Sequence, residues 1–177
     1  MDELIAFLDA LDRSAPGKPT HCSAWTTHDL LAHMVARTEK MTRLATLAAA
    51  GGPDPVTRSF VEREAPWRAT ADDQLREAFV PAGARLVCAL DALPVGTTVA
   101  FTGWAMTADQ LLLHARSELA LHRWDLVGDD DTGKHLLAQP ELMAHGRSVL
   151  VHMPTLHEAR RTPRPDDDLL TMWGRRR

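Results

Sequence analysis

Apolar residues recur at intervals of three and four along much of the chain, a spacing typical of amphipathic helices. The pattern predicts helices over residues 2–13, 27–49, 70–92, 107–127 and 140–159. Three of these segments begin with a Thr followed three residues later by an acidic or amide residue, as in a capping box. These pairs are Thr26 with Asp29, Thr70 with Asp73, and Thr107 with Gln110. We therefore expect an all-α protein.

Prolines and glycines mark the breaks in this pattern. Pro140 favours a helix start, whereas Pro154 predicts that the fifth helix breaks early or kinks. Pro81 and Gly83 predict a kink or split in the third helix. We expect connections over residues 14–25, 51–69 and 94–106, the last with a β-prone run from residue 97 to 101 that forms a short strand or extended crossover. The acidic run 128–133 lacks EF-hand spacing and predicts a solvated loop.

Length and composition indicate how many domains the chain forms and where the protein is located. With 177 residues, 45% of them hydrophobic, the chain predicts one domain, over residues 1–160, and a C-terminal tail over 161–177. No apolar run approaches the roughly 20 residues of a membrane span. The N-terminus is acidic where a secretory signal is basic, so we expect a cytoplasmic protein.

Charge and cysteine content argue against a nucleic-acid-binding protein and against a metal site built from cysteines. The formal net charge is -4 and no basic stripe is present, so we expect no nucleic-acid partner. The two cysteines, Cys22 and Cys88, have no metal-ligand spacing and are interpreted as reduced packing residues. The late basic residues are interpreted as a solvated tail: Arg160, Arg161, Arg164, Arg175, Arg176 and Arg177.

Candidate functional residues lie on the helix predicted over residues 107–127. At about 100° per residue, one face gathers within about 60° of Glu118; its members are Leu111, His114, Ala115, His122 and Asp125. Arg116 and Arg123 fall on the opposite face and are expected to point outward. Glu118 and His122 therefore point into the bundle, where an ionised carboxylate alone costs several kcal/mol. Side chains four residues apart can share one cation.

The helix over 27–49 supplies a third ligand. Its projection places His33 at the edge of the apolar stripe and His28 toward solvent. His114 is interpreted as pocket lining or support for the ligands, and Asp125 as the acceptor of the second ring N–H of His122. Geometry alone leaves two alternatives open: a metal site, or a hydrogen-bonded buried Glu–His pair without metal.

Two motifs resemble a known family. Residues 20–26, THCSAWT, followed by DLLAH over 29–33, are similar to the start of the metal-binding domain of mycothiol-dependent maleylpyruvate isomerases. The run ELALHRWDL over 118–126 resembles the second metal motif of that family. The family belongs to the DinB-like superfamily, so the resemblance implies a DinB-like four-helix bundle, here with an additional C-terminal helix. The resemblance covers residues 1–127.

The resemblance also implies a site and a cofactor. It implies metal ligation by His33, Glu118 and His122, usually of zinc and in some relatives of nickel or another divalent ion. Mycothiol is the cosubstrate that it implies, although relatives use bacillithiol. Shorter single-domain relatives include thiol transferases, so an S-transferase is expected beside an isomerase.

We therefore expect a divalent-metal-dependent enzyme that activates a low-molecular-weight thiol for addition to a small electrophile. Arg37 is a candidate for binding a carboxylate of the substrate, and His114 lines the same pocket. No catalytic residue is assigned. A non-catalytic metal- or ligand-binding module and a metal-water hydrolase are the alternatives. We expect a monomer or homodimer, and a Glu118→Ala variant that loses metal but keeps its fold.

Overall fold

The computed structural model describes residues 2–22, 25–52, 58–153 and 167–175. Within these residues the chain forms eight helices and one two-stranded sheet. The helices are α1 (Asp2–Asp12), α2 (Thr27–Ala49), α3 (Phe60–Arg68), α4 (Asp72–Asp91), α5 (Ala108–Val127), α6 (Asp131–Leu137), α7 (Pro140–His152) and α8 (Leu169–Met172). The strands are β1 (Val99–Phe101) and β2 (Trp104–Met106).

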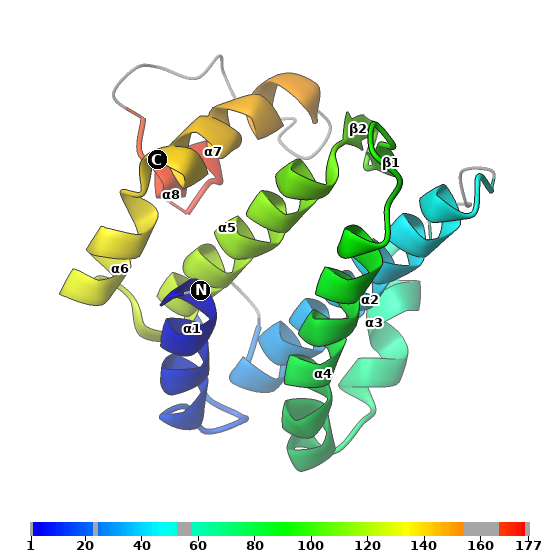
Figure 1. Cartoon of the computed structure of the whole chain (residues 1–177). Coiled ribbons are helices and arrows are strands. Elements are labelled where there is room, and N and C mark those ends of the chain that lie inside the picture. The colour runs from blue at the N-terminus through cyan, green and yellow to red at the C-terminus, as the bar shows by residue number, and fades with distance from the viewer. Residues whose placement is uncertain (1, 23–24, 53–57, 154–166, 176–177) are drawn as a thin grey trace.

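Helices α1, α2, α4 and α5 form a bundle (Figure 1). Helix α2 packs most extensively on α4, α1 packs on α5, and α5 also contacts α2 and α4. Helices α6 and α7 lie along the other side of α5, and α3 covers α2. The expected all-α bundle with additional C-terminal helical structure is confirmed.

The short strand expected before the last bundle helix is confirmed as half of a β-hairpin. Strands β1 and β2 pair antiparallel, with Val99 opposite Met106. The turn between them, Thr102–Gly103, has positive φ at both residues, which suits the twist of a tight hairpin. The inward side chains of both strands are buried, and β1 packs on α2. The hairpin thus covers one end of the bundle.

Two of the three predicted capping boxes are confirmed. Thr26 caps α2 with Asp29, and Thr107 caps α5 with Gln110. The predicted box at Thr70 is wrong, because α4 begins at Asp72 after Ala71 and has no side-chain cap. The Thr70 hydroxyl instead donates to the Pro66 carbonyl, at 3.0 Å.

Two segments expected to be irregular contain helices. The connection 51–69 contains α3, which starts with a capping box between Ser59 and Glu62. The acidic run 128–133 is not a solvated loop, because Asp130 caps α6 and binds Arg123. Both helices are short, so their apolar periodicity is too weak to mark them in the sequence.

The proline predictions have mixed outcomes. Helix α4 is continuous through Pro81, so the predicted split is wrong. Helix α7 begins at Pro140 and ends at His152, ahead of Pro154, as predicted. The expected domain boundary at 160 lies outside the described residues. The described part of the expected tail is folded, because Leu169, Leu170, Met172 and Trp173 of this segment belong to the hydrophobic core.

The loop between α1 and α2 is fixed to the C-terminal end of α5. The backbone N–H of His21 donates to the Asp125 carbonyl at 2.7 Å. Helix α5 is capped by Gly128, whose φ is 77°, and a Cβ there would lie 2.9 Å from His21 Nε2. Glycine therefore permits both the helix end and the close approach of this loop. This contact holds Trp25 near the last turns of α5.

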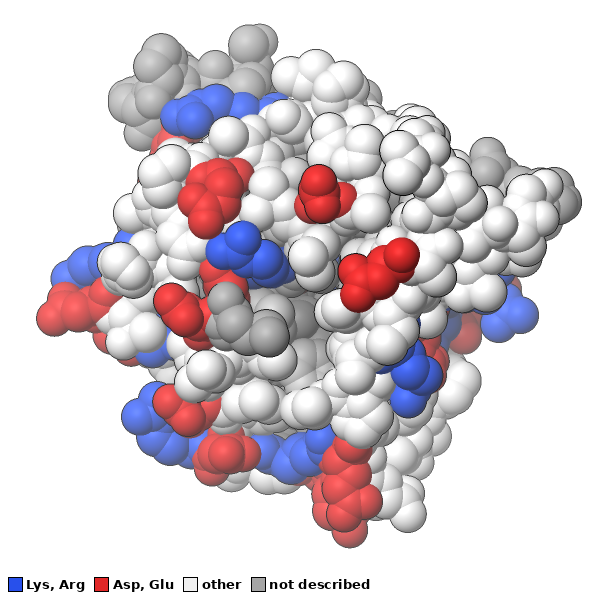
Figure 2. Space-filling view, in the orientation of Figure 1, with Lys and Arg blue, Asp and Glu red and all other residues white. Residues whose placement is uncertain are grey.

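Surface charge is mixed on the face seen in Figure 2, where basic and acidic side chains are interspersed. None of the described helices is long and apolar enough to cross a lipid bilayer.

Candidate metal centre

Three potential metal ligands from two helices lie together in the bundle interior. His33 comes from α2, and Glu118 and His122 come from successive turns of α5. One ligand atom of each lies within 4.8 Å of the other two, and the residues are only 3–5% exposed. Glu118 Oε2 and His122 Nε2 are 3.3 Å apart. This separation matches the edge of about 3.4 Å in a tetrahedral zinc site with bonds of about 2.1 Å.

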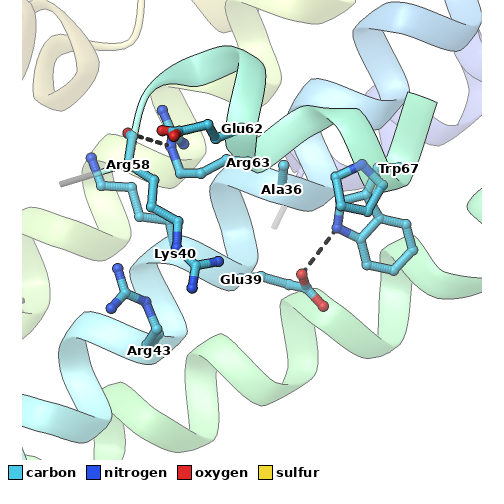
Figure 3. Close-up of a pocket in the computed structure, with 9 residues that line it drawn as sticks. Ala36, Glu39, Lys40, Arg43, Arg58, Glu62, Arg63 and Trp67 are labelled. Carbon is cyan, nitrogen blue, oxygen red and sulfur yellow. Dashed lines mark hydrogen bonds between the residues drawn. The ribbon is translucent and has the colours of Figure 1, made fainter. Parts of the chain in front are cut away.

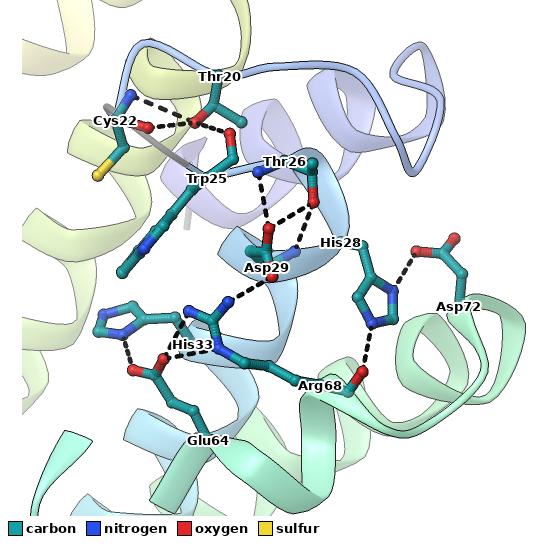
Figure 4. Close-up of polar contacts among 10 residues, drawn as sticks. All are labelled: Thr20, Cys22, Trp25, Thr26, His28, Asp29, His33, Glu64, Arg68 and Asp72. Atoms are coloured by element: carbon teal, nitrogen blue, oxygen red, sulfur yellow. Dashed lines mark hydrogen bonds and ion pairs between the residues drawn. The ribbon is translucent and has the colours of Figure 1, made fainter. Parts of the chain in front are cut away.

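Both histidines are held through Nδ1 by a buried carboxylate. Nδ1 of His122 donates to Asp125 Oδ2 at 2.8 Å. Figure 4 shows the second contact, in which Nδ1 of His33 donates to Glu64 Oε1 at 2.6 Å. When a ring held in this way is neutral, its proton is on Nδ1 and Nε2 carries the lone pair that a metal requires. A carboxylate on the second ring nitrogen is the usual support of metal-binding histidines. The residues therefore fit a divalent cation.

Arginines anchor the two supporting carboxylates in turn. Arg68 Nη2 donates to Glu64 Oε2 at 2.9 Å and the same guanidinium contacts Asp29 (Figure 4). Arg175 Nη2 and Nε donate to the Asp125 carboxylate at 2.8 and 3.0 Å. Arg175 was expected in a solvated tail; this prediction is wrong, because Asp125 is fully buried and draws the guanidinium inward.

Burial and neighbouring charge set the protonation of the three residues. Burial alone would raise the pKa of Glu118, but Arg37 and His122 hold it well below its usual value. Burial lowers the pKa of His33 to about 4, although its hydrogen bond to Glu64 acts in the opposite direction. Burial would also lower the pKa of His122, but Asp125 and Glu118 raise it. At neutral pH the site thus contains an ionised glutamate and a neutral His33.

Arg37 and His114 extend the site deeper into the protein. Arg37 Nη2 lies 3.0 Å from Glu118 Oε1 and also donates to His114 Nε2. Since that nitrogen accepts, Nδ1 of a neutral His114 carries the proton, and it lies 3.0 Å from His145 Nε2. His114 is fully buried, and Nε of Arg37 is buried without a hydrogen-bond partner among the described residues.

Two aromatic rings flank His33. The Trp25 ring centroid lies 4.8 Å from the His33 ring centroid, and the Phe60 centroid lies 5.9 Å from it. Trp25 also stacks near His122, at 6.3 Å. Phe60 and Glu64 were missed because α3 was expected to be a connection. The capping box of Ser59 is the sequence signal that could have revealed both.

The remaining candidates lie apart from the three ligands. His28 interacts with Asp72 and the Arg68 carbonyl instead. Arg116 pairs with Glu3 of α1 and is partly exposed. Arg123 was expected to point outward, but this is wrong: it is 2% exposed because α6 covers it and Asp130 pairs with it.

Neither cysteine belongs to the ligand cluster. Cys88 is exposed on α4, so its interpretation as a packing residue is wrong. Cys22 is half-buried, and burial raises the pKa of its thiol, with Arg175 lowering it and Asp125 and Glu118 raising it further. The thiol of Cys22 therefore lies within electrostatic range of the site, which its position in the sequence did not indicate.

A helical bundle with two carboxylate-supported histidines and a glutamate converging in its interior defines a candidate metalloprotein. The sequence profile described as Mycothiol maleylpyruvate isomerase N-terminal domain matches residues 1–127, and the chain belongs to this family. The resemblance drawn from residues 20–33 and 118–126 is thereby confirmed. No curated protein matches the sequence.

A solved structure shares the fold. The crystal structure of a His-to-Ala variant of the mycothiol-dependent maleylpyruvate isomerase matches the chain with a TM-score of 0.69 and 19% sequence identity. The match covers 82% of this chain and 63% of that chain. The chain therefore spans less than two thirds of the length of that enzyme.

Proposed function

We propose that His33, Glu118 and His122 bind a divalent metal ion, with zinc the first choice and nickel the second. Two imidazole nitrogens and one carboxylate oxygen form a donor set that suits zinc. The proposal is supported by the convergence of three buried side chains, one potential ligand atom of each lying within 4.8 Å of the other two. The alternative is a hydrogen-bonded Glu118–His122 pair without metal. That alternative does not explain why His33 from α2, held by Glu64 from α3, lies beside the pair.

The chain's own residues prepare the site for such an ion. Asp125 and Glu64 hold the ring protons on Nδ1 and so direct both Nε2 atoms to the same point. Arg37 occupies Oε1 of Glu118, leaving Oε2 as the oxygen next to His122. Trp25 and Phe60 cover His33 and limit the access of water. When bound, the ion would supply Lewis acidity that lowers the pKa of a thiol.

We further propose that the protein is an enzyme whose cosubstrate is a low-molecular-weight thiol, mycothiol. The observation that carries this step is membership of the mycothiol maleylpyruvate isomerase family over residues 1–127. The thiolate sulfur would add to an electrophilic carbon of a small substrate. Elimination after rotation about the former double bond would return the thiol and give isomerisation, whereas retention of the new C–S bond would give S-transfer.

Arg37 is proposed to contact the substrate, and His114 to hold Arg37 in position. Nε of Arg37 has no hydrogen-bond partner among the described residues, so it can donate to an acidic oxygen of the substrate. His114 supports Arg37 from behind through Nε2. We place the protein in the cytoplasm, where small thiols are kept reduced.

Cobalt substitution tests the proposal. Cobalt-loaded protein should gain a sulfur-to-metal charge-transfer band when mycothiol or a simple thiol is added. His33→Ala should lose the band, whereas the control His28→Ala, on the same helix but outside the cluster, should keep it. A metal-loaded protein whose spectrum ignores thiols would favour a metal-water hydrolase or a non-catalytic binding module. Absence of any stoichiometric metal in wild-type protein would exclude the metal site itself.

A further inference from the structure

A hollow lies between α2 and α3, on a part of the surface that contributes no metal ligand (Figure 3). Its volume is about 310 Å³. It is lined by Ala36, Glu39, Lys40, Arg43, Arg58, Glu62, Arg63, Pro66 and Trp67. Four of these nine side chains are cationic, and they come from α2, from α3 and from the segment just before α3.

The four cations have no ion-pair partner among the described residues. Lys40 Nζ donates to the Thr102 hydroxyl at 3.3 Å and lies 4.5 Å from the centroid of the Phe101 ring. Arg63 Nε donates to the Arg58 carbonyl at 3.3 Å. Neutral groups therefore hold the half-buried Lys40 and Arg63 in place without neutralising them.

The two carboxylates of the hollow already accept hydrogen bonds. Glu62 accepts from the backbone N–H and hydroxyl of Ser59, closing the capping box of α3. Glu39 accepts from the Trp67 indole at 3.0 Å and lies 3.9 Å from Arg85. Four cations thus face one hollow that contains two already bonded carboxylates.

Repulsion among the four cations raises the free energy of the folded protein while the hollow is empty. Like charges repel most strongly where solvent is partly excluded. Burial, followed by the charges of Arg63, Arg37 and Arg43, lowers the pKa of Lys40 to about 8. An anion in the hollow would relieve this repulsion, and the fixed cations would need little reorganisation to bind it.

We propose that this hollow is a binding site for a small organic dianion carrying carboxylate or phosphate groups. Lys40 and Arg63 would bind its charged groups at the wall, Arg43 and Arg58 would bind them at the rim, and Trp67 with Pro66 would contact its carbon atoms. The site goes beyond the proposed thiol chemistry and does not rest on it, because none of the lining residues belongs to the ligand cluster.

Calorimetric titration of the full-length protein tests this site, with succinate and inorganic phosphate as probes and sodium chloride at equal ionic strength as the blank. Saturable binding of either dianion is expected, and the stronger probe identifies the preferred acidic group. A Lys40→Gln/Arg63→Gln variant should bind at least about tenfold more weakly. The control Arg13→Gln/Lys18→Gln removes the same charge from exposed positions near the α1–α2 loop and should change affinity less than about twofold.

A second variant tests the same site at an exposed position, in case the Lys40→Gln/Arg63→Gln variant does not fold. Arg43 is exposed, so Arg43→Glu should fold normally and still weaken binding, in contrast to Lys18→Glu. The metal-site variant His33→Ala should bind the dianion as the wild type does. Binding that is lost in His33→Ala, that survives in both pocket variants, or that never exceeds the chloride blank would overturn the proposal.

Discussion

Nine histidines are present in the chain, and the partner of Nδ1 separates the candidate ligands from several of the others. His33 and His122 donate to carboxylates that arginines hold in place. Nδ1 of His114 faces the neutral ring of His145 instead. Because a buried carboxylate fixes the tautomer and increases the basicity of Nε2, this local feature supports the two histidines as ligands. It is not exclusive to them, since Nδ1 of His28 also donates to a carboxylate that an arginine holds.

Asp125→Asn tests this support without touching a ligand. The amide keeps the size of the side chain but removes the negative charge that stabilises the His122 ring proton. Zinc affinity, measured by competition with a chromogenic chelator, should fall by about 10–100-fold. Asp72→Asn is the matched control, because Asp72 accepts from Nδ1 of His28, which lies outside the cluster. Equal zinc affinity in the two variants would argue against the role of Asp125.

Replacing Glu118 should cost stability as well as metal. The sequence alone predicted that the fold would tolerate this change, because a buried charge is removed with its desolvation cost. The structure places Arg37 against Glu118, so Glu118→Gln leaves a buried guanidinium without its carboxylate. Breaking such a pair costs about 3–5 kcal/mol.

A double variant separates the two effects. Glu118→Gln should lose metal, by elemental analysis, and should have a lower Tm by circular dichroism. Glu118→Gln/Arg37→Met removes the unpaired charge as well, so it should recover much of the Tm while still lacking metal. Metal retained in either variant would remove Glu118 from the ligand set.

At the scale of helices and strands, long periodic segments were predictable and short ones were not. Helices α2 and α5 have 23 and 20 residues and begin with true capping boxes, so their bounds could be predicted within a residue or two. His33, Glu118 and His122 lie on these helices, and that is why the sequence could bring them together. Helix α3 has only nine residues, so its apolar residues did not mark it, and the capping box of Ser59 was the one signal that could have placed Glu64 on a helix.

Helix α3 should influence the metal site through its N-terminal cap. Ser59→Ala removes the hydroxyl that accepts from Glu62 N–H, which costs about 1 kcal/mol of local stability. Hydrogen exchange of residues 60–68 should accelerate, and zinc affinity should fall several-fold because Glu64 is held less firmly against His33. Ser59→Asp restores a side-chain acceptor and should recover both. Faster exchange without any change in zinc affinity would show that Glu64 does not support the site.

At the scale of the whole molecule, buried histidines make stability depend on pH. Burial lowers the pKa of both His33 and His145 to about 4, compared with about 6.5 in an unfolded chain. Between these values the unfolded chain binds more protons than the folded one. The free energy of unfolding should therefore fall as the pH decreases from about 6.5 toward 4, by roughly 1 kcal/mol per pH unit for each histidine. His122 opposes this trend, since its pKa is raised.

Urea unfolding of the metal-free protein at pH 7, 6 and 5, in the presence of a chelator, measures this dependence. His145 is the residue to change, because it is buried but is not a candidate ligand. His145 is the last residue in the series of hydrogen bonds from Arg37 to His114 to His145, and the Gln side chain can still form a hydrogen bond there. The variant removes one group that takes up a proton when the protein unfolds in acid. Its stability should fall less steeply with acid than that of the wild type, whereas the exposed control His135→Gln should follow the wild type. A slope that is unchanged in His145→Gln, or a wild type more stable at pH 5 than at pH 7, would show that the buried histidines are not kept neutral by the fold.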